Sequence, residues 1–339
     1  MHVLTALLIM VSIAGCDLFG PSENQTEVGA NTVSAVAADE EALYADVFST
    51  GQLGRSYDRG ESWEVVQVFG EDEADGQSLR ISEIATDGEV VFAGLGSFSE
   101  GMPMVRISED EGETWKDFAD GLPYHNLGID DLEIGPDENV YAVTWGNVYR
   151  RDYGNPSNTW DVINTGTDAF QAGTLDIRNG VIYAAGAGGI RVSEDGETWT
   201  PVGDLDEDVM RINALAGRLV AGTTGGSVYE YDFDGETWTT IYDEPSDRLN
   251  PVQAIEETPE GLCVGWDQEL VLRCFGNNGE MTESSIEIPN LEDVDRPGVR
   301  ALLYGNTGRF FAGLHLGIAH SDDEGRTWTP TIQYPVELP

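Results

Sequence analysis

Short apolar segments separated by turn residues extend along most of the chain. In the clearest of them two apolar residues precede an alanine or valine, and this segment occurs seven times: Leu43-Tyr44-Ala45, Val91-Phe92-Ala93, Val140-Tyr141-Ala142, Ile182-Tyr183-Ala184, Leu219-Val220-Ala221, Leu262-Cys263-Val264 and Phe310-Phe311-Ala312. Such runs, bounded by Gly, Asn and Asp, are typical of β-strands. No long stretch shows the 3.6-residue period of an amphipathic helix. The pattern predicts an all-β protein of seven similar units.

A polar turn followed by a tryptophan recurs between these segments. Its fullest form is Ser321 to Trp328, SDDEGRTW, with related copies at 56–63, 108–115 and 193–199 and partial ones at 152–160 and 232–238. A carboxylate at the third position can accept hydrogen bonds from backbone N–H groups of its own turn, and glycine takes a positive φ without strain. We therefore predict that the turn aspartates are structural and are neither metal ligands nor catalytic groups: Asp58, Asp110, Asp195, Asp234 and Asp323.

The turn tryptophans indicate the size of the repeating unit. Trp63 and the four turn tryptophans that follow it lie 52, 45, 39 and 39 residues apart, close to the ~40–50 residues of a four-stranded propeller blade. Ninety residues separate Trp238 from Trp328, enough for two blades, so the sixth unit has lost its turn. The sequence predicts a seven-bladed β-propeller of four-stranded blades at residues 32–339.

The frame S-x-D-x-G-x-T-W resembles the Asp-box, the BNR-type repeat of sialidase-like β-propellers. Sialidases use an arginine triad, and three arginines here enter the inner strands of units two, five and seven, where they could hold a carboxylate: Arg80, Arg211 and Arg300. However, sialidases have six blades, no Arg-Ile-Pro motif stands near the first unit, and no Tyr–Glu nucleophile pair can be assigned. Photosystem II stability and assembly factors are similar in blade count, but their partner surface is basic.

The N-terminal segment has the features of an export signal. An apolar run begins at Val3, and Ile13-Ala14-Gly15-Cys16 resembles the lipobox of bacterial lipoproteins, although the start of the run holds His2 and no Lys or Arg. We expect residues 1–15 to be a signal peptide, Cys16 to be lipidated, and residues 16–31 to be a flexible tether. The alternative is an ordinary secretory signal with a chance cysteine. The lipobox predicts a membrane-anchored lipoprotein of the bacterial cell envelope, periplasmic or on the surface.

The two remaining cysteines lie in the sixth unit. A turn at Gln268-Glu269 would place Cys263 opposite Cys274 on antiparallel strands. In an oxidising compartment such a pair can form a disulfide, which we expect, with two buried thiols as the alternative.

The charge of the chain limits its partners. With 62 acidic and 17 basic residues the formal net charge is −45, which argues against binding to nucleic acid or to anionic lipid. The acidic loops, such as 204–208, could attract a cationic partner or Ca²⁺, but a solvated acidic surface is the favoured interpretation, because the acid excess extends over the whole chain. The four histidines are scattered, so we expect no metal site and no cofactor.

Candidate ligand residues gather where the second strands end, at one mouth of the expected channel. They are Phe48, Trp145, Trp266 and His315, together with Arg80, Arg211 and Arg300. Aromatic side chains there could stack on a sugar or grip a peptide, or could simply pack locally. We therefore expect a monomeric, non-catalytic envelope lipoprotein that binds a protein or glycan partner. The alternative is a glycoside hydrolase of the sialidase type.

Overall fold

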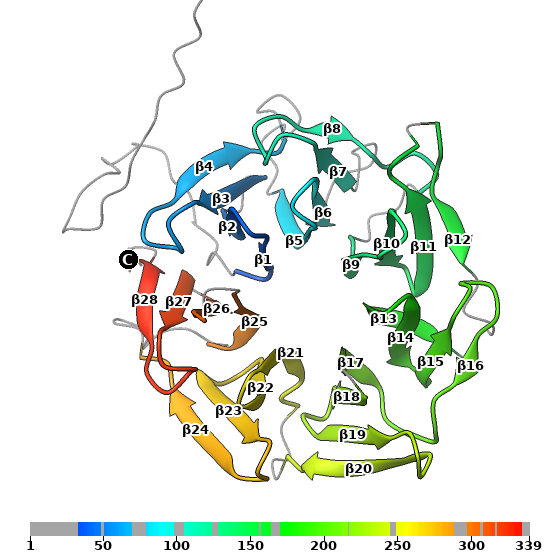
Figure 1. Ribbon diagram of the computed structural model, residues 1–339, viewed down its shortest axis with the longest axis vertical. Helices are drawn as coiled ribbons and strands as arrows, with labels where there is room; N and C mark the ends of the chain where they lie inside the picture. The colour runs from blue at the N-terminus through cyan, green and yellow to red at the C-terminus, as the bar shows by residue number, and fades with distance from the viewer. Residues whose placement is uncertain are drawn as a thin grey trace, which may run out of the picture.

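Seven four-stranded antiparallel sheets surround a central channel (Figure 1). The structure is a computed structural model that describes residues 33–48, 51–69, 79–97, 105–123, 128–155, 157–163, 170–215, 217–244, 249–287, 297–305, 308–315 and 317–333. These residues form 28 strands and contain no helix, so none of them belongs to a membrane-crossing helix. The predicted all-β, seven-bladed fold is confirmed. The expected signal peptide, Cys16 and the tether lie outside the described residues.

Each blade consists of four consecutive strands, ordered from the channel outward (Figure 1). The strands are, blade by blade, β1 (Val36–Ala38), β2 (Leu43–Phe48), β3 (Gln52–Ser56), β4 (Glu64–Gln67); β5 (Arg80–Thr86), β6 (Val91–Ser97), β7 (Val105–Ser108), β8 (Lys116–Asp117); β9 (Asp131–Ile134), β10 (Asn139–Thr144), β11 (Asn147–Asp152), β12 (Asp161–Ile163); β13 (Gln171–Arg178), β14 (Val181–Ala187), β15 (Gly189–Ser193), β16 (Thr200–Pro201); β17 (Val209–Leu215), β18 (Arg218–Thr223), β19 (Val228–Asp232), β20 (Thr237–Tyr242); β21 (Val252–Thr258), β22 (Gly261–Trp266), β23 (Val271–Gly276), β24 (Met281–Ser285); β25 (Val299–Tyr304), β26 (Phe310–Leu314), β27 (Gly317–Ser321), β28 (Thr329–Gln333).

The hydrophobic core lies between neighbouring blades. Phe92 of blade two is fully buried and packs in one cluster with Leu132 and Trp160 of blade three. The Trp160 indole N–H also crosses between blades and donates to the Phe118 carbonyl at 2.6 Å. The side chains of an apolar second strand therefore pack against both neighbouring blades. This explains why these residues form the most regular pattern in the sequence.

The ring closes without exchanging a strand between the first and last blades, since the described strands of blade one and of blade seven each form their own sheet. The Val33 N–H donates to the Leu314 carbonyl at 2.8 Å across this junction. Arg309 of blade seven donates to the Arg59 carbonyl and pairs with Glu61 of blade one, at 2.8 and 3.0 Å. Side-chain and main-chain bonds across the junction hold the ring closed.

In four blades the turn aspartate closes the hairpin between the third and fourth strands. Its Oδ1 accepts the backbone N–H of the residue before the tryptophan at 2.7–2.8 Å in Asp58, Asp110, Asp195 and Asp323. In blade seven the Gly325 N–H donates to Ser321 Oγ, and Gly325 has a φ of 84°, which glycine tolerates. Backbone N–H groups of Thr198 and Glu197 lower the pKa of Asp195 to about 2.

Blade five departs from the predicted pattern at Asp234. Here Asp232 Oδ1 accepts the Asp234 N–H at 3.0 Å, so the carboxylate that accepts a turn N–H belongs to Asp232 and the bond differs from that of the four other blades. This partial copy has no serine at the first position of the frame, and its turn is tighter, with Thr237 opposite Asp232 in the ladder. The structural role predicted for Asp234 is therefore wrong.

The sixth blade carries the expected cysteine pair. Cys263 of β22 lies opposite Cys274 of β23, and the two form a disulfide with a Cα–Cα distance of 4.1 Å. In the ladder Met281 takes the place of the turn tryptophan, opposite Phe275, and this methionine is 48% exposed. The loss of the turn motif has thus left the blade itself intact.

Candidate ligand site at the channel mouth

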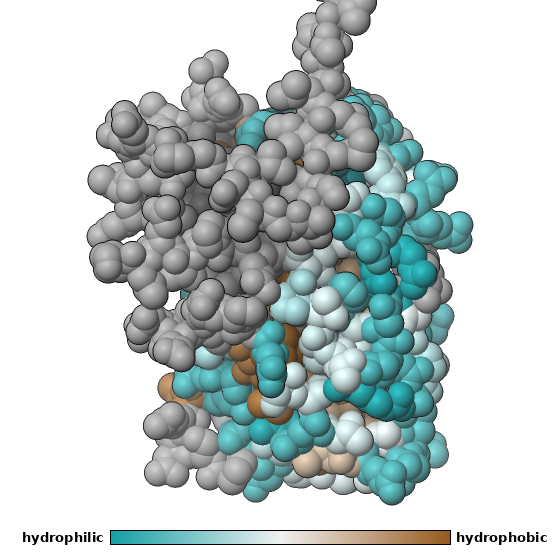
Figure 2. Space-filling view, turned by 90° about the vertical axis from the view of Figure 1, so that its left-hand side faces the viewer, coloured by the Kyte–Doolittle hydropathy of each residue, from teal (hydrophilic) through white to brown (hydrophobic). Residues whose placement is uncertain are grey.

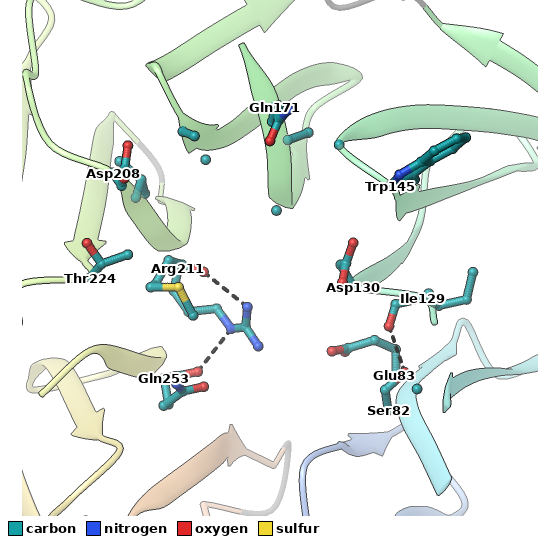
Figure 3. A pocket seen from close by; sticks show the side chains of 18 of the residues that line it. Ser82, Glu83, Ile129, Asp130, Trp145, Gln171, Asp208, Arg211, Thr224 and Gln253 are labelled. Carbon is teal, nitrogen blue, oxygen red and sulfur yellow. Dashed lines mark hydrogen bonds between the residues drawn. The ribbon is translucent and has the colours of Figure 1, made fainter. Parts of the chain in front are cut away.

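One end of the channel opens into a cavity of about 1150 Å³ (Figure 3). The inner strands begin and the second strands end here, so segments from several blades meet around the opening. Polar and apolar groups share the lining about equally, and the polar ones include Glu83, Asp130, Asn147, Gln171, Arg211 and Gln253. One large aromatic side chain, Trp145, stands among them in the described part of the wall.

Trp145 has an unusual backbone conformation. It forms the two-residue turn between β10 and β11 with Gly146, and the two φ values are +53° and +76°. Two successive positive φ values define a type I′ turn, which favours Asn, Asp and Gly. Holding another L-residue in this left-handed region costs roughly 1–2 kcal/mol, and the Trp145 side chain is 54% exposed, so little burial offsets that cost. Strain of this kind is concentrated at functional sites.

Three hydrogen bonds hold the turn that carries Trp145. The carboxylate of Asp130 accepts the backbone N–H of Trp145. The Ala172 N–H, from the next blade, donates to the Gly146 carbonyl at 3.0 Å, and Asn147 Nδ2 donates to the Trp145 carbonyl at 3.1 Å. The indole therefore stands on a rigid backbone as a preformed flat surface. Burial, followed by the charge of Asp131, raises the pKa of Asp130 to about 6.

Arg211, at the start of β17, points toward the centre of the mouth (Figure 3). Its Nε donates to the Gln253 carbonyl and its Nη1 to the Met210 carbonyl, each at 3.0 Å. Glu83 and Asp130 stand on the opposite wall, where burial raises the pKa of both and the positive charge of Arg211 opposes this rise only in part. Among the described residues no carboxylate lies within 4.0 Å of this guanidinium.

The other two predicted arginines also line the mouth, but each has an acidic neighbour. Arg80 Nε lies 3.9 Å from Asp46, whose side chain is almost wholly buried, and its guanidinium donates to Ser34 Oγ. Arg300 Nη1 lies 2.5 Å from the buried carboxylate of Asp267. Burial raises the pKa of Asp46 well above its ordinary value, so this group is a weak counter-charge for Arg80. All three arginines therefore line one cavity, and Arg300 has the closest acidic partner.

The predicted aromatic residues do not all reach the mouth. Trp266 is fully buried, and its indole N–H donates to the Gly226 carbonyl at 2.9 Å. The ladder explains the error: Val264 of blade six is equivalent to Ala142 of blade three, so Trp266 matches the buried Thr144 and Asp267 matches Trp145. A shift of one residue moves a strand side chain to the other face. The assignment of Trp266 as a ligand residue is therefore wrong.

His315 and Phe48 are the two other aromatic residues predicted at the ends of the second strands. His315 is half-buried, and burial, followed by the charges of Arg300 and Arg80, lowers its pKa. It is therefore a neutral neighbour of those arginines at pH 7. Phe48 ends β2, but its side chain lies outside the described part of the chain.

Below the mouth, the channel narrows to a cavity of about 210 Å³ lined by carboxyl groups that the sequence reading missed. Asp131, Asp176 and Glu256 each accept a backbone N–H from the next inner strand, at 2.9, 2.7 and 2.8 Å. Burial raises the pKa of Glu83 and Glu133 well above the ordinary value, although both side chains keep some surface on the channel.

A pattern in the sequence could have identified Glu133, Asp176 and Glu256 among these groups. Acidic or amide residues recur at one register position of the inner strands: Glu133, Asp176, Asn213 and Glu256. No cluster of His, Cys, Asp and Glu in the described residues has an arrangement that could hold a metal ion.

The chain matches no protein-family model, and no curated protein is similar to it in sequence. Solved structures share its fold at low identity. A GH74 enzyme of Niastella koreensis is 16% identical with a TM-score of 0.68, over 90% of this chain and 55% of that one. YCF48 bound to D1 peptide is 14% identical with a TM-score of 0.61, over 84% of this chain and 91% of that one.

A third similar structure is an extracellular domain. It belongs to BT4673 of B. thetaiotaomicron, described as a hybrid two component system, and is 13% identical with a TM-score of 0.64, over 87% of this chain and 39% of that one. The chain thus spans about two fifths of that extracellular domain. At these identities the comparisons show a shared propeller fold.

Proposed function

We propose that this protein is a non-catalytic ligand-binding propeller of a bacterial envelope lipoprotein, which binds a protein or glycan partner at the channel mouth. The observation that carries the proposal is Trp145, a strained and exposed aromatic residue that faces a cavity and is held by Asp130. A residue that contributes so little to the core at such a conformational cost is explained by contact with a ligand.

Two of the similar structures are in line with this proposal. YCF48 was solved bound to D1 peptide, and the BT4673 structure is that of an extracellular domain. Anchoring through Cys16 is part of the same proposal. Labelling with a radioactive fatty acid should mark the full chain and fail to mark Cys16→Ser, whereas equal labelling of both would contradict the anchor.

The test of the binding site is Trp145→Asn. Because Asn-Gly is the sequence that a type I′ turn favours, we expect this variant to keep its free energy of unfolding within about 1 kcal/mol. Calorimetric titration of the full chain with oligosaccharides and with peptides of envelope proteins should yield a ligand whose affinity falls at least about tenfold in the variant, as for a buried aromatic anchor.

Phe233→Asn is the matched control. Phe233 is also an exposed aromatic residue, 44% accessible, but it lies in the turn after β19, at the end of blade five away from the mouth. It should leave the affinity unchanged. If Trp145→Asn binds every ligand as tightly as the native chain, the mouth is not the ligand site.

The second candidate, a glycoside hydrolase, is favoured by one observation, because Glu83 and Asp130 both line the cavity and both have raised pKa values. Most glycosidases use two carboxyl groups that face the same bond. No tyrosine is found in the described lining, which does not favour a sialidase. Release of fluorophore from a panel of fluorogenic glycosides, lost in Glu83→Gln, would establish hydrolysis in place of simple binding.

A further inference from the structure

At three junctions an arginine of one blade donates to the polar turn of the next blade. The acceptor is each time the backbone carbonyl of the residue that precedes the turn glycine. The pairs are Arg55 with Glu111, Arg150 with Asp195 at 3.4 Å, and Arg309 with Arg59 at 2.8 Å. Arg55 and Arg309 also bind a glutamate of the same turn, Glu113 at 2.9 Å and Glu61 at 3.0 Å. The turn therefore has a place for a guanidinium, which the preceding blade can fill.

The junction between blades six and seven lacks this arginine. In blades one and three the arginine stands on the third strand opposite a tyrosine of the second strand, Arg55 opposite Tyr44 and Arg150 opposite Tyr141. In blade six the disulfide takes both positions, with Cys274 opposite Cys263. Because a cysteine side chain is much shorter than an arginine, it does not extend to the turn of blade seven.

A pocket of about 500 Å³ lies at this junction, at the end of the ring away from the mouth. Both cysteines line it on the side of blade six, and residues 324–326 of the turn line it on the side of blade seven. The Glu324 carbonyl is the equivalent of the acceptors at the other junctions, and no described guanidinium donates to it. The place that an arginine fills elsewhere is therefore an open pocket here.

The pocket is also acidic. Four glutamates and one arginine line it, and of these glutamates Glu283 is already paired with Arg273. Glu324 Oε2 is buried, and Arg326 Nη2 lies 3.7 Å from it, too far for a hydrogen bond. The Glu260 carboxyl beside Glu324 raises the pKa of Glu324, and Arg326 pairs with Glu260 at the exposed rim, at 2.6 Å. Two carboxyl groups thus share one exposed cation, which favours the entry of a second.

We infer that the pocket between blades six and seven binds an arginine side chain of a protein partner, whose guanidinium takes the place that Arg55 and Arg309 hold at other junctions. Its acceptors are the Glu324 carbonyl and the carboxylates of Glu324 and Glu260. A planar guanidinium can donate to a carbonyl and a carboxylate together, as Arg55 does, whereas a lysine ammonium is a single point of charge.

The size and the rim of the pocket favour a peptide over a free guanidinium compound. The volume of about 500 Å³ leaves room for residues beside the arginine. Asn277, Asn278 and Thr282 line the pocket with groups that can bond to a peptide backbone. The pocket and the channel mouth are at opposite ends of the ring, so this inference does not depend on the proposed ligand site.

The test compares peptides that differ at one residue. The full chain is titrated calorimetrically, at an ionic strength of about 0.15 M, with a short acetylated peptide of glycine and serine that has one central arginine. The same peptide with citrulline keeps the shape of the side chain and loses its charge. The arginine peptide should bind at least about tenfold more tightly than the citrulline peptide. In Glu324→Gln this preference should fall to about twofold or less.

Glu111→Gln is the matched control, because Glu111 has the same position in the turn of blade two, where Arg55 already donates to the carbonyl. This variant should keep the full preference for arginine. A further variant fills the pocket from within the chain. Cys263→Tyr combined with Cys274→Arg copies the pair of blades one and three, and should lose the preference while it still melts cooperatively. If this double variant does not fold, Glu324→Gln decides alone.

Three results would overturn the inference. They are no binding of the arginine peptide at millimolar concentration, equal binding of the arginine and citrulline peptides, and equal losses in Glu324→Gln and Glu111→Gln, which would indicate attraction to the acidic surface as a whole. A lysine peptide that binds as tightly as the arginine peptide would overturn the guanidinium. Trp145→Asn should leave this binding unchanged, so the pocket and the channel mouth are tested separately.

Discussion

Single side chains in this propeller have roles that depend on the turn in which they stand. Asp323 and Asp234 are both acidic residues of a turn between third and fourth strands, yet only Asp323 accepts hydrogen bonds from its own turn, from the N–H and the hydroxyl of Thr327 at 2.8 and 2.7 Å. In blade five Asp232 accepts a different bond, from the N–H of Asp234. Residue type alone therefore does not define the role.

This contrast leads to a prediction about stability. Asp323→Ala should lower the free energy of unfolding by roughly 1–3 kcal/mol, because the Thr327 N–H and hydroxyl lose their partner. Asp234→Ala, whose carboxylate closes no turn, should change it by less than about 0.5 kcal/mol. Urea unfolding at pH 7 measures both. Equal losses in the two variants would contradict the distinction drawn from the structure.

The inner strands of neighbouring blades are linked by a hydrogen bond from a backbone N–H to an acidic side chain, which repeats around the ring. Each strand has backbone N–H groups on its free edge toward the channel, and an acidic side chain of the preceding blade accepts some of them, as Asp176 does for Ala214 and Glu256 for Tyr304. The groups that accept these bonds are crowded. Burial, with a smaller contribution from Asp176, raises the pKa of Glu256 to about 8.

The stability of the ring should therefore depend on the charge of Glu256. Between its ordinary pKa of 4.5 and about 8 the folded protein binds a proton that the unfolded chain releases, so the free energy of unfolding falls as pH rises through this window. The slope is at most about 1.4 kcal/mol per pH unit for one proton.

Glu256→Gln isolates this effect because glutamine still offers an oxygen to the Tyr304 N–H. The variant should equal the native chain near pH 4.5 and exceed its stability at pH 8–9, as measured by thermal melts across pH. A difference between the two proteins that does not vary with pH would show that Glu256 is already ionised in the folded state.

The whole molecule carries an excess of negative charge that its ion pairs cannot offset. The net charge is −45, and Figure 2 shows hydrophilic residues over most of the described surface on the side it presents. Exposed pairs such as Arg326–Glu260, at 2.6 Å, contribute about 1 kcal/mol or less each. Mutual repulsion among the unpaired carboxylates therefore opposes the compact state.

Salt should stabilise this protein. The screening length falls from ~10 Å at 0.1 M to ~3 Å at 1 M ionic strength, which weakens repulsion between acidic loops and leaves the apolar contacts between blades intact. We expect the melting temperature to rise steadily as NaCl increases from millimolar to molar concentrations. A melting temperature that stays constant in NaCl would contradict the repulsion argument.

The effect of calcium on the melting temperature can be compared with that of NaCl. The described residues contain no cluster that could hold a metal ion, so CaCl₂ at matched ionic strength should add little to the effect of NaCl. A large additional rise would reveal a calcium site in the acidic loops.

The sequence by itself determined the features that depend on neighbouring residues and recur. The seven apolar segments and the tryptophan spacing predicted the blade number, and the spacing of Cys263 and Cys274 placed them opposite each other in a hairpin. Local hydrogen bonds and strand pairing within one blade decide these features, so they are visible in short windows of sequence.

Only the tertiary structure decided how the mouth is built. The ladder of blade six moved Trp266 into the core and placed Asp267 beside Arg300, and the folded ring brought Arg211 opposite Glu83. It also showed Trp145 in a left-handed turn, fastened by Asp130 and by the next blade. These arrangements depend on a one-residue register and on groups that are distant in the chain. They arise only when all seven blades close around one axis.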